Sequence, residues 1–197
     1  RPVIGGSSSL IEVAPYIAPM QKGDPRVISG WTMYDWANSV YSLTITSAVF
    51  PVFYAAITID GDLDKVMDRY GLPAMSLYSY VISASFLLIA LVAPILSGIA
   101  DHTGQKKKFL KAFCYLGALS CAGLFFFDVD HLWLGLMFAM LASIGYSGSL
   151  IFYDAFLPEI AEPKDHDRIS ARGYMMGYIG SVCLLILNLA MVMSPES

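Results

Sequence analysis

Five stretches of the sequence are long and apolar enough to cross a lipid bilayer as helices. A bilayer core of about 30 Å requires about 20 mostly apolar helical residues for each crossing. Windows that meet this requirement run over about 31–58, 77–100, 109–127, 131–156 and 174–193. Helices are expected rather than strands, because five strands could not close a barrel without leaving an edge unpaired. The windows therefore predict an all-α membrane protein with five transmembrane helices.

The overall composition agrees with a membrane location. Hydrophobic residues make up 56% of the chain, charged residues only 14%, and the mean hydropathy is +0.60. A soluble domain carries charge on about a quarter of its residues, so this chain has little polar material to cover a soluble surface. The net charge of −4 with 12 Lys and Arg residues provides no basic surface for nucleic acid. We expect a lipid bilayer around the chain and no nucleic-acid partner.

Basic residues gather in alternate connections between the predicted helices. The segments before the first span, between the second and third and between the fourth and fifth hold, with Arg1, ten of the twelve positive residues. The other two, Lys65 and Arg69, lie in an acidic loop on the opposite side. Because positive loops stay in the cytoplasm, the pattern predicts a cytoplasmic N-terminus and a fifth helix that exits outward.

The N-terminal end differs in character from the rest of the chain. Residues 1–19 contain a linker-like Gly-Gly-Ser-Ser-Ser run and an apolar stretch interrupted by Glu12, Pro15 and Pro19, so we interpret them as a tag or non-native leader. Residues 20–30 are predicted to be the cytoplasmic N-terminus, and 31–197 a partial transmembrane half. The odd number of spans indicates a fragment whose C-terminal half is missing.

The turn between the second and third spans combines glycines, an aspartate and a basic cluster. Gly98 is expected to permit close helix approach, and Gly104 a tight turn with positive φ. Asp101 is expected to face the positive N-terminus of another helix or a buried arginine. Lys106 and Lys107 would hold the loop in the cytoplasm. An ordinary tight hairpin held by positive charges explains the same pattern.

This turn resembles the signature loop of the major facilitator superfamily, Gly-x-x-x-Asp-x-x-Gly followed by basic residues. It departs from that pattern because Asp101 follows Gly98 by three positions rather than four, and because His102 replaces the usual basic residue. The looser spacing resembles the vacuole-effluxer-like branch, which is related to the autophagy-linked amino-acid effluxers of fungal vacuoles. Further stretches carry the same resemblance over about residues 20–193: Tyr34–Ser39 with Phe50-Pro51, Phe156–Ile160, and Ser170–Tyr174 with Gly177–Ser181.

The resemblance implies a fold of about twelve helices in two related halves, of which this chain supplies five of the first six. It implies secondary active transport by alternating access, with the solute route between the halves. The leading hypothesis is therefore efflux of a small polar solute such as an amino acid. The rival hypothesis is a non-transporting membrane protein, either a scaffold or accessory protein or a membrane-embedded enzyme. A bacterial inner membrane is the expected location, and a vacuolar membrane is the alternative.

The first span carries four polar residues at helical spacing. Asp35, Asn38, Ser42 and Thr46 are separated by three, four and four residues, which predicts one polar stripe on a single helix face. Ionisable residues inside membranes usually face a cavity or a partner helix. Asp35 is therefore a candidate to bind an ion, a proton or a substrate amine, or else it caps or gates near the cytoplasmic interface. Asn38 is expected to join helices or to act as a ligand.

The fourth span places Ser143 and Ser147 on one face, with Asp154 seven residues further on. The serines are candidates for the solute pathway, whereas Asp154, near the cytoplasmic end, is expected to act as a gate or loop contact. The neighbouring glycines, Gly145 and Gly148, predict close helix packing. Many facilitator families carry an arginine and a glutamine inside this helix, and this sequence has neither, so the usual form of proton coupling is not expected.

The fifth span repeats small residues at a spacing of four. Gly173, Gly177 and Ser181 predict a close packing seam, and Asn188 lies seven residues beyond as a polar ligand at its outer end. The charged connector before this span is interpreted as solvated, except for Arg172, which matches the family motif and joins the signature-loop residues as a gating candidate.

No group of residues resembles an enzyme site or a cofactor site. His102, His131 and His166 fall in separate loops on both sides of the predicted membrane, so they cannot gather around one metal. The three cysteines lie in apolar surroundings, where inert thiols are expected. The sequence has no phosphate-binding glycine loop followed by Lys-Ser/Thr. Transport would therefore use a gradient or be passive, with no cofactor.

Overall fold

The computed structural model describes residues 22–61 and 63–193, so the interpretation of residues 1–19 lies outside the described chain. Within it, five helical stretches are long and apolar enough to cross a membrane: Pro25–Thr58, Ala74–Thr103, Lys106–Phe126, Leu132–Ile160 and Pro163–Met191. Each overlaps one predicted span. The all-α membrane fold is therefore confirmed, with several helices beginning earlier than predicted.

The first spanning stretch consists of three continuous helical segments. Helix α1 (Pro25–Val40) passes into a π-helical segment, η1 (Tyr41–Val49), and then into α2 (Phe50–Thr58). Asp24 caps the beginning of α1 by accepting a hydrogen bond of 2.8 Å from the Arg26 backbone N–H. In the π segment a backbone N–H bonds five residues back, as that of Phe50 does to the Ile45 carbonyl. The side chains beyond residue 40 are therefore rotated relative to a regular α-helix.

A compact connection follows the first spanning stretch. The two-residue strands β1 (Ile59–Asp60) and β2 (Leu63–Asp64) pair in antiparallel fashion, and the short helix α3 (Lys65–Tyr70) comes next. Asp64 accepts hydrogen bonds from the backbone N–H groups of Val66, Met67 and Ala74, at 2.8–2.9 Å. Burial acts to raise the pKa of Asp64, but these three bonds outweigh it and lower the pKa below its usual value.

The rest of the described chain forms four long helices, each running antiparallel to the one before it, with short connections between them. Its elements are α4 (Ala74–Thr103), α5 (Lys106–Gly123) with η2 (Leu124–Phe126), η3 (Val129–His131) with α6 (Leu132–Asp154), α7 (Leu157–Ile160), η4 (Pro163–Asp165) and α8 (His166–Met193). Gly104 ends α4 with a φ of 65°, which confirms the predicted tight turn. Helix α8 begins eight residues before the predicted fifth span, so Arg168 and Arg172 lie on a helix rather than in a loop.

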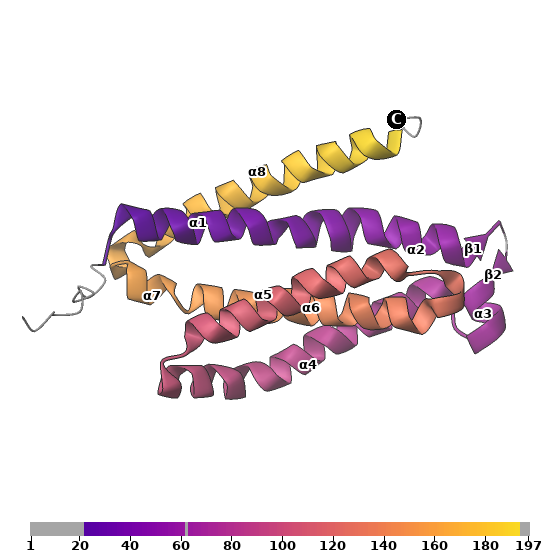
Figure 1. Ribbon diagram of the computed structural model, residues 1–197, viewed down its shortest axis with the longest axis horizontal. Coiled ribbons are helices and arrows are strands. Elements are labelled where there is room, and N and C mark those ends of the chain that lie inside the picture. The colour runs from indigo at the N-terminus through magenta and orange to yellow at the C-terminus, as the bar shows by residue number, and fades with distance from the viewer. Residues whose placement is uncertain (1–21, 62, 194–197) are drawn as a thin grey trace, which may run out of the picture.

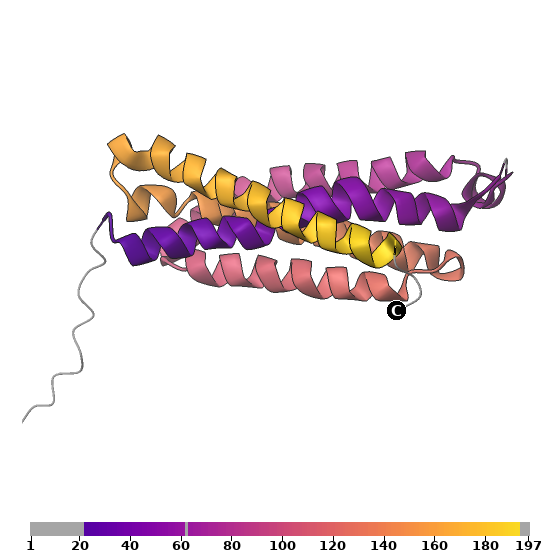
Figure 2. The same ribbon diagram turned by 90° about the horizontal axis from the view of Figure 1, so that it is seen from above.

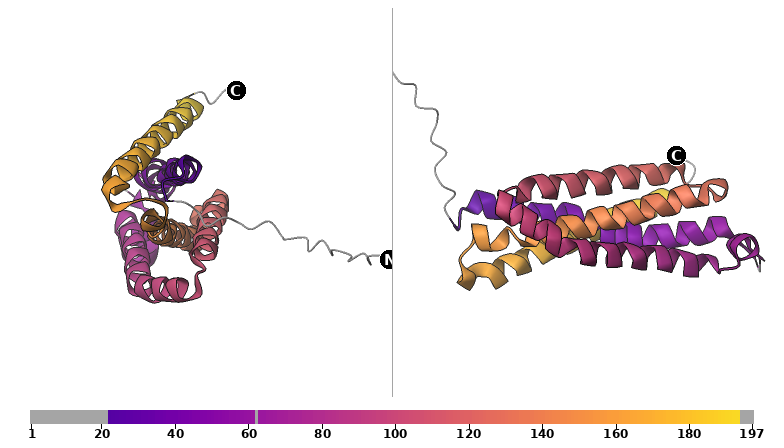
Figure 3. Two further views of the ribbon diagram at one scale, coloured as in Figure 1. Left: turned by 90° about the vertical axis from the view of Figure 1, so that its left-hand side faces the viewer. Right: turned by 90° about the horizontal axis from the view of Figure 1, so that it is seen from below.

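The helices pack in two groups (Figure 1), and side-chain contacts between α1 and α6 connect the groups. Helix α8 packs mainly against α1, and α4 and α5 both pack against α6. Figure 2 shows α8 crossing over α1. The view along the bundle in Figure 3 shows α8 leaning outward on one side and the α4–α5 hairpin on the other. The fifth spanning helix thus packs on the first, and the second and third pack on the fourth.

Packing within the bundle relies on aromatic residues at one end and on glycines along the helices. Phe50 and Tyr54 stack on Phe127 with ring centroids 5.6 and 5.9 Å apart. A methyl group on Gly145 would collide with the backbone of Gly117 on α5. These contacts fix the distance between α5 and α6, and with it the position of the α6 residues that face α1.

Candidate functional site

The first polar site is built around Asp35 of α1. Only 6% of this residue is exposed. Ser39 lies one helical turn further on, as its spacing of four dictates, and its hydroxyl donates a 3.2 Å hydrogen bond to Asp35 Oδ1. Among the described residues the three ion pairs do not include Asp35. Among residues 22–61 and 63–193, this buried carboxyl group thus has one hydroxyl partner and no cationic one.

Tyr153 of α6 forms the opposite wall of this site. Its ring stacks on Trp31 at 4.2 Å and on Tyr34 at 5.0 Å between ring centroids, and Trp31 Nε1 donates a 3.1 Å bond to its backbone carbonyl. The ring is thus held between two aromatic side chains. Its hydroxyl is buried and has no hydrogen-bond partner among the described residues. The carboxylate of the neighbouring Asp154 lies within electrostatic range of Asp35.

Helix α8 closes the site through its glycines. A Cβ atom at position 173 would lie 3.0 Å from the Trp31 ring, 3.1 Å from Asp35 Oδ2 and 3.2 Å from the Tyr153 hydroxyl oxygen. Gly177 lies against Ser39, and Gly180 against Trp36. The predicted seam of small residues is therefore where α8 approaches α1. The approach is tightest at Gly177, where a Cβ atom would lie 2.5 Å from Ser39 Oγ, and Gly173 lies beside the Asp35 carboxyl group.

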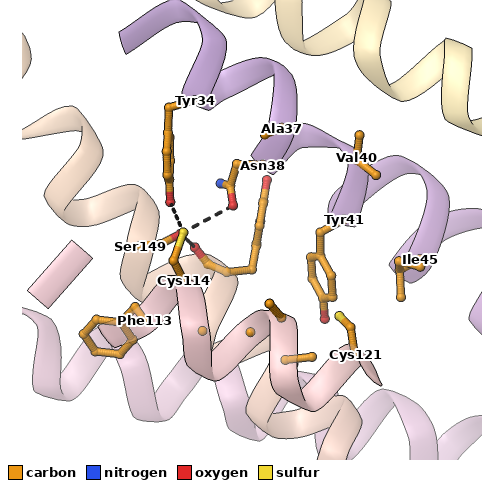
Figure 4. Close-up of a pocket in the computed structure, with 15 residues that line it drawn as sticks. Tyr34, Ala37, Asn38, Val40, Tyr41, Ile45, Phe113, Cys114, Cys121 and Ser149 are labelled. Atoms are coloured by element: carbon orange, nitrogen blue, oxygen red, sulfur yellow. Dashed lines mark hydrogen bonds between the residues drawn. The ribbon is translucent and has the colours of Figure 1, made fainter. Parts of the chain in front are cut away.

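A second site with polar residues is a cavity between α1, α5 and α6 (Figure 4). The cavity has a volume of about 350 Å³ and mostly apolar walls. The Tyr34 hydroxyl lies 3.1 Å from Cys114 Sγ, and the Ser149 hydroxyl donates a 3.5 Å bond to Asn38 Oδ1. The amide nitrogen of Asn38 is buried without a partner. The site therefore presents an unused hydrogen-bond donor among hydroxyl and thiol groups.

The four residues of the predicted stripe do not share one surface. Asp35 lies between α6 and α8, whereas Asn38 lines the cavity. The Ser42 hydroxyl donates to the backbone carbonyl of Ser39 at 3.1 Å, and the Thr46 hydroxyl is buried without a partner. The prediction assumed a regular α-helix through residue 46. The π-helical turn after Val40 changes that period, so the last two positions rotate away from the first two.

The other predicted pathway residues lie in separate places. The Ser143 hydroxyl bonds to that of Tyr41 at 2.9 Å, while Ser147 and Asn188 are half-buried on α6 and α8. The sequence interpretation missed Tyr34, Tyr41, Tyr153 and Ser149. The seven-residue spacing of Tyr34 and Tyr41 places both hydroxyls on one helix face, a signal that could have identified them.

The turn between α4 and α5 takes part in a chain of ion pairs. Lys106 Nζ lies 2.8 Å from Asp101 Oδ1 and 2.7 Å from Glu159 Oε1. Asp101 was expected to face the N-terminus of another helix or a buried arginine, and its partner is Lys106, the first residue of α5, rather than an arginine. Glu159 was interpreted as solvated, yet it ties α7 to this turn. The side chains of Lys107, Asp154 and Arg172 are exposed.

Gly98 differs from its expected role. A Cβ atom at this position would meet no atom within 4 Å among the described residues. The expected close helix approach at Gly98 is therefore wrong for this part of the chain. The described residues also contain no group of three or more His, Cys, Asp or Glu side chains that could hold a metal ion.

The fold and its buried polar groups define an integral membrane protein built from transmembrane helices. The chain belongs to the family described as "Vacuole effluxer Atg22 like", which matches residues 23–197. This match confirms the resemblance predicted from the spaced motifs.

Individual relatives come from bacteria and fungi. The chain is 37% identical over 178 residues to the "Uncharacterized MFS-type transporter YxiO" of Bacillus subtilis, covering 90% of this chain and 40% of that protein. It is 30% identical over 172 residues to "Autophagy-related protein 22" of Neurospora crassa, covering 75% of this chain and 23% of that protein. The chain thus spans less than half the length of these relatives. No solved structure matches it at a significant level.

Proposed function

We propose that the full-length protein is a secondary active transporter that exports a small polar solute, such as an amino acid, by alternating access. The observation that carries this proposal is the burial of Asp35 within a bundle of helices that are long and apolar enough to span a membrane. Asp35 has no cationic partner among the described residues. An ionisable group inside the membrane is costly and usually serves transport. Membership of an effluxer family and the transporter name of one relative support transport rather than catalysis.

The polar residues of α1 and α6 supply suitable chemistry for such a solute. A carboxylate at Asp35 complements a cation or the ammonium group of an amino acid. The unused amide donor of Asn38 complements a carboxylate or carbonyl group. Ser42, Thr46, Ser143, Ser147 and Asn188 stay candidates for the same pathway.

The cytoplasmic turn is proposed to act as a gate. Asp101, Lys106 and Glu159 connect the α4–α5 turn to α7, next to the end of α6. Movement of these helices during alternating access would break such exposed ion pairs at small cost. Five further residues lie at this turn or at the ends of α6 and α8 that are on the same side of the bundle. They are proposed to take part in the same movement: Gly98, Gly104, Lys107, Asp154 and Arg172.

The remaining features of the proposal concern the whole protein. Alternating access requires a second half, which would follow this chain and complete the solute route. The distribution of basic residues supports a cytoplasmic N-terminus. A bacterial inner membrane is the proposed location and a vacuolar membrane the alternative, since the relatives include a bacterial and several fungal proteins.

Flux measurements test the proposal. The full-length protein would be reconstituted into liposomes loaded with a labelled amino-acid mixture, and net release would be followed against protein-free liposomes. We expect release above that background, with Asp35→Asn lowering net release at least tenfold. Asp167→Asn, at an exposed carboxylate of α8, is the matched control and should leave release unchanged. Absence of release for every amino acid, or full release by Asp35→Asn, would contradict the proposal.

A further inference from the structure

The beginning of α5 carries a cluster of exposed cationic side chains. We propose that Lys107, Lys108 and Lys111 form a binding surface for the headgroup of an anionic phospholipid, in the leaflet on that side of the membrane. This proposal goes beyond the proposed transport function, because it concerns the lipid-facing outside of the bundle rather than the solute route between its helices.

Positive charge is concentrated at this corner of the bundle. Residues 101–111 hold four lysines and one aspartate. The connector 159–172, at the same end of the bundle (Figure 1), holds three basic and four acidic residues. Residues 22–26, also at this end, hold two basic residues and one acidic residue. Basic residues in any of these segments would serve to keep this end on one side of the membrane. The surplus at the beginning of α5 therefore needs a local explanation.

Three of the four lysines have no carboxylate beside them. Lys106 is partly buried, and its Nζ lies 2.8 and 2.7 Å from two carboxylate oxygens. Lys107, Lys108 and Lys111 are exposed, and the ion pairs found over the described chain do not include them. Like charges three or four residues apart on a helix repel one another. An anion bound between these three ammonium groups would relieve that repulsion.

The same face of α5 continues into a surface that is exposed to lipid. Lys108, Lys111, Tyr115 and Leu119 follow one another at intervals of three, four and four residues, so they lie along one face of the helix. Tyr115 and Leu119 are 67% and 70% exposed, as expected of side chains that contact acyl chains. The lysines lie about one to three turns nearer the end of the helix. They are thus placed where the headgroup of a lipid packed against Tyr115 and Leu119 would end.

The chemistry of the cluster favours an anionic headgroup. A lysine ammonium group donates hydrogen bonds to phosphate oxygens and attracts their negative charge. The headgroup of phosphatidylcholine carries a cation of its own, which the lysines repel, whereas that of phosphatidylglycerol does not. Clusters of about four or more basic residues beside a spanning helix are typical binding surfaces for anionic lipids. The N-terminus of α5, which has no side-chain cap, adds a partial positive charge.

Native mass spectrometry of the full-length protein measures single lipid-binding events. The detergent-solubilised protein would be titrated with phosphatidylglycerol and, separately, with phosphatidylcholine of the same acyl chains. We expect the first phosphatidylglycerol to bind at least about fivefold more tightly, the factor that corresponds to about 1 kcal/mol for one lysine near an anionic surface. This preference should shrink as salt is added. Equal binding of the two lipids would overturn the proposal.

Matched double variants assign the preference to this surface. Lys108→Gln with Lys111→Gln should remove most of the preference for phosphatidylglycerol, whereas Lys108→Arg with Lys111→Arg should keep it, because the charge is retained. The control pair, Lys164→Gln with Arg168→Gln, removes two charges from exposed positions at the same end of the bundle and should leave the preference unchanged. An equal loss in the control, or a full preference in the Lys108→Gln and Lys111→Gln variant, would overturn the assignment.

A soluble headgroup distinguishes a lipid surface from a general anion site. Glycerol 3-phosphate offers a phosphate group without acyl chains. We expect an excess of it to leave phosphatidylglycerol bound, because the acyl chains contact Tyr115 and Leu119 as well. Displacement of the lipid by glycerol 3-phosphate would overturn the lipid assignment and identify a soluble phosphate compound as the ligand. The measurement does not use solute flux, so failure of the proposed transport function would not change its result.

Discussion

The indole ring of Trp31 and the phenol ring of Tyr153 stack almost in parallel, with centroids 4.2 Å apart and an interplanar angle of 12°. The two residues are 122 positions apart in the sequence, and a hydrogen bond from the indole to the Tyr153 carbonyl joins them a second time. This double contact fixes the end of α6 against α1, and it holds one wall of the Asp35 site in place.

Replacement of Trp31 should therefore destabilise the junction of α1 and α6. Trp31→Ala removes the stacked ring and the hydrogen bond, and truncation of a packed aromatic residue costs about 3–5 kcal/mol. We expect a loss near the lower end, because Trp31 is only half-buried. Denaturant unfolding in detergent micelles measures the change. Trp133→Ala, at a residue that is 56% exposed, should cost clearly less, and equal losses for both variants would contradict the argument.

Replacement of glycine by alanine should lower the stability of the protein where the glycine is closely packed, and not where the space around it is open. Gly145→Ala places a methyl group against the backbone of Gly117, which cannot move aside as a side chain can, and overpacking of this kind costs about 1–3 kcal/mol. Gly98→Ala lies on a helix with no atom within 4 Å of the new methyl group. It should stabilise the helix by up to about 1 kcal/mol. Thermal unfolding of both variants tests this, and destabilisation by Gly98→Ala would show that another segment packs there.

The ion pair between Lys106 and Glu159 should contribute little to stability. Glu159 is half exposed, and exposed pairs are worth about 0.2–1 kcal/mol. A double-mutant cycle with Lys106→Ala and Glu159→Gln should give a coupling free energy in this range at low salt, falling as salt is added. Glu162→Gln, at a neighbouring exposed carboxylate, should show no coupling to Lys106→Ala. A salt-independent coupling above this range would mean that the pair is buried in the full-length protein.

The cap formed by Asp64 should make stability depend on pH on the acid side. The folded-state pKa of Asp64 lies below its unfolded value of about 3.9. Its stabilising contribution is thus complete above that value and is lost as the pH falls through the folded-state pKa. Asp64→Ala should cost about 0.5–2 kcal/mol at pH 7, as losses of helix caps do. The difference from the unmodified protein should shrink as the pH falls below about 4, and a constant difference down to pH 2 would contradict this account.

The sequence by itself determined the membrane location and the number of spanning helices. These depend on the total apolar content of windows of about 20 residues, which changes little with the packing around them. The tight turn at Gly104 could also be predicted from the sequence, and the structure gives this glycine the positive φ that such a turn requires. The spaced motifs were sufficient to predict the family, because their order along the chain is independent of the three-dimensional arrangement.

Only the tertiary structure decided which polar groups meet. Tyr153 and Asp35 border the same Gly173 position because α6 contacts α1 through the Trp31–Tyr153 stack and α8 packs against α1 there. Asp35 and Asn38 have different neighbours although both lie on the regular helix α1, and the π-helical turn after Val40 changes the period before Ser42 and Thr46. Helical spacing predicts the face on which a residue lies only while the period holds. Which neighbour covers that face depends on contacts between residues far apart in the chain.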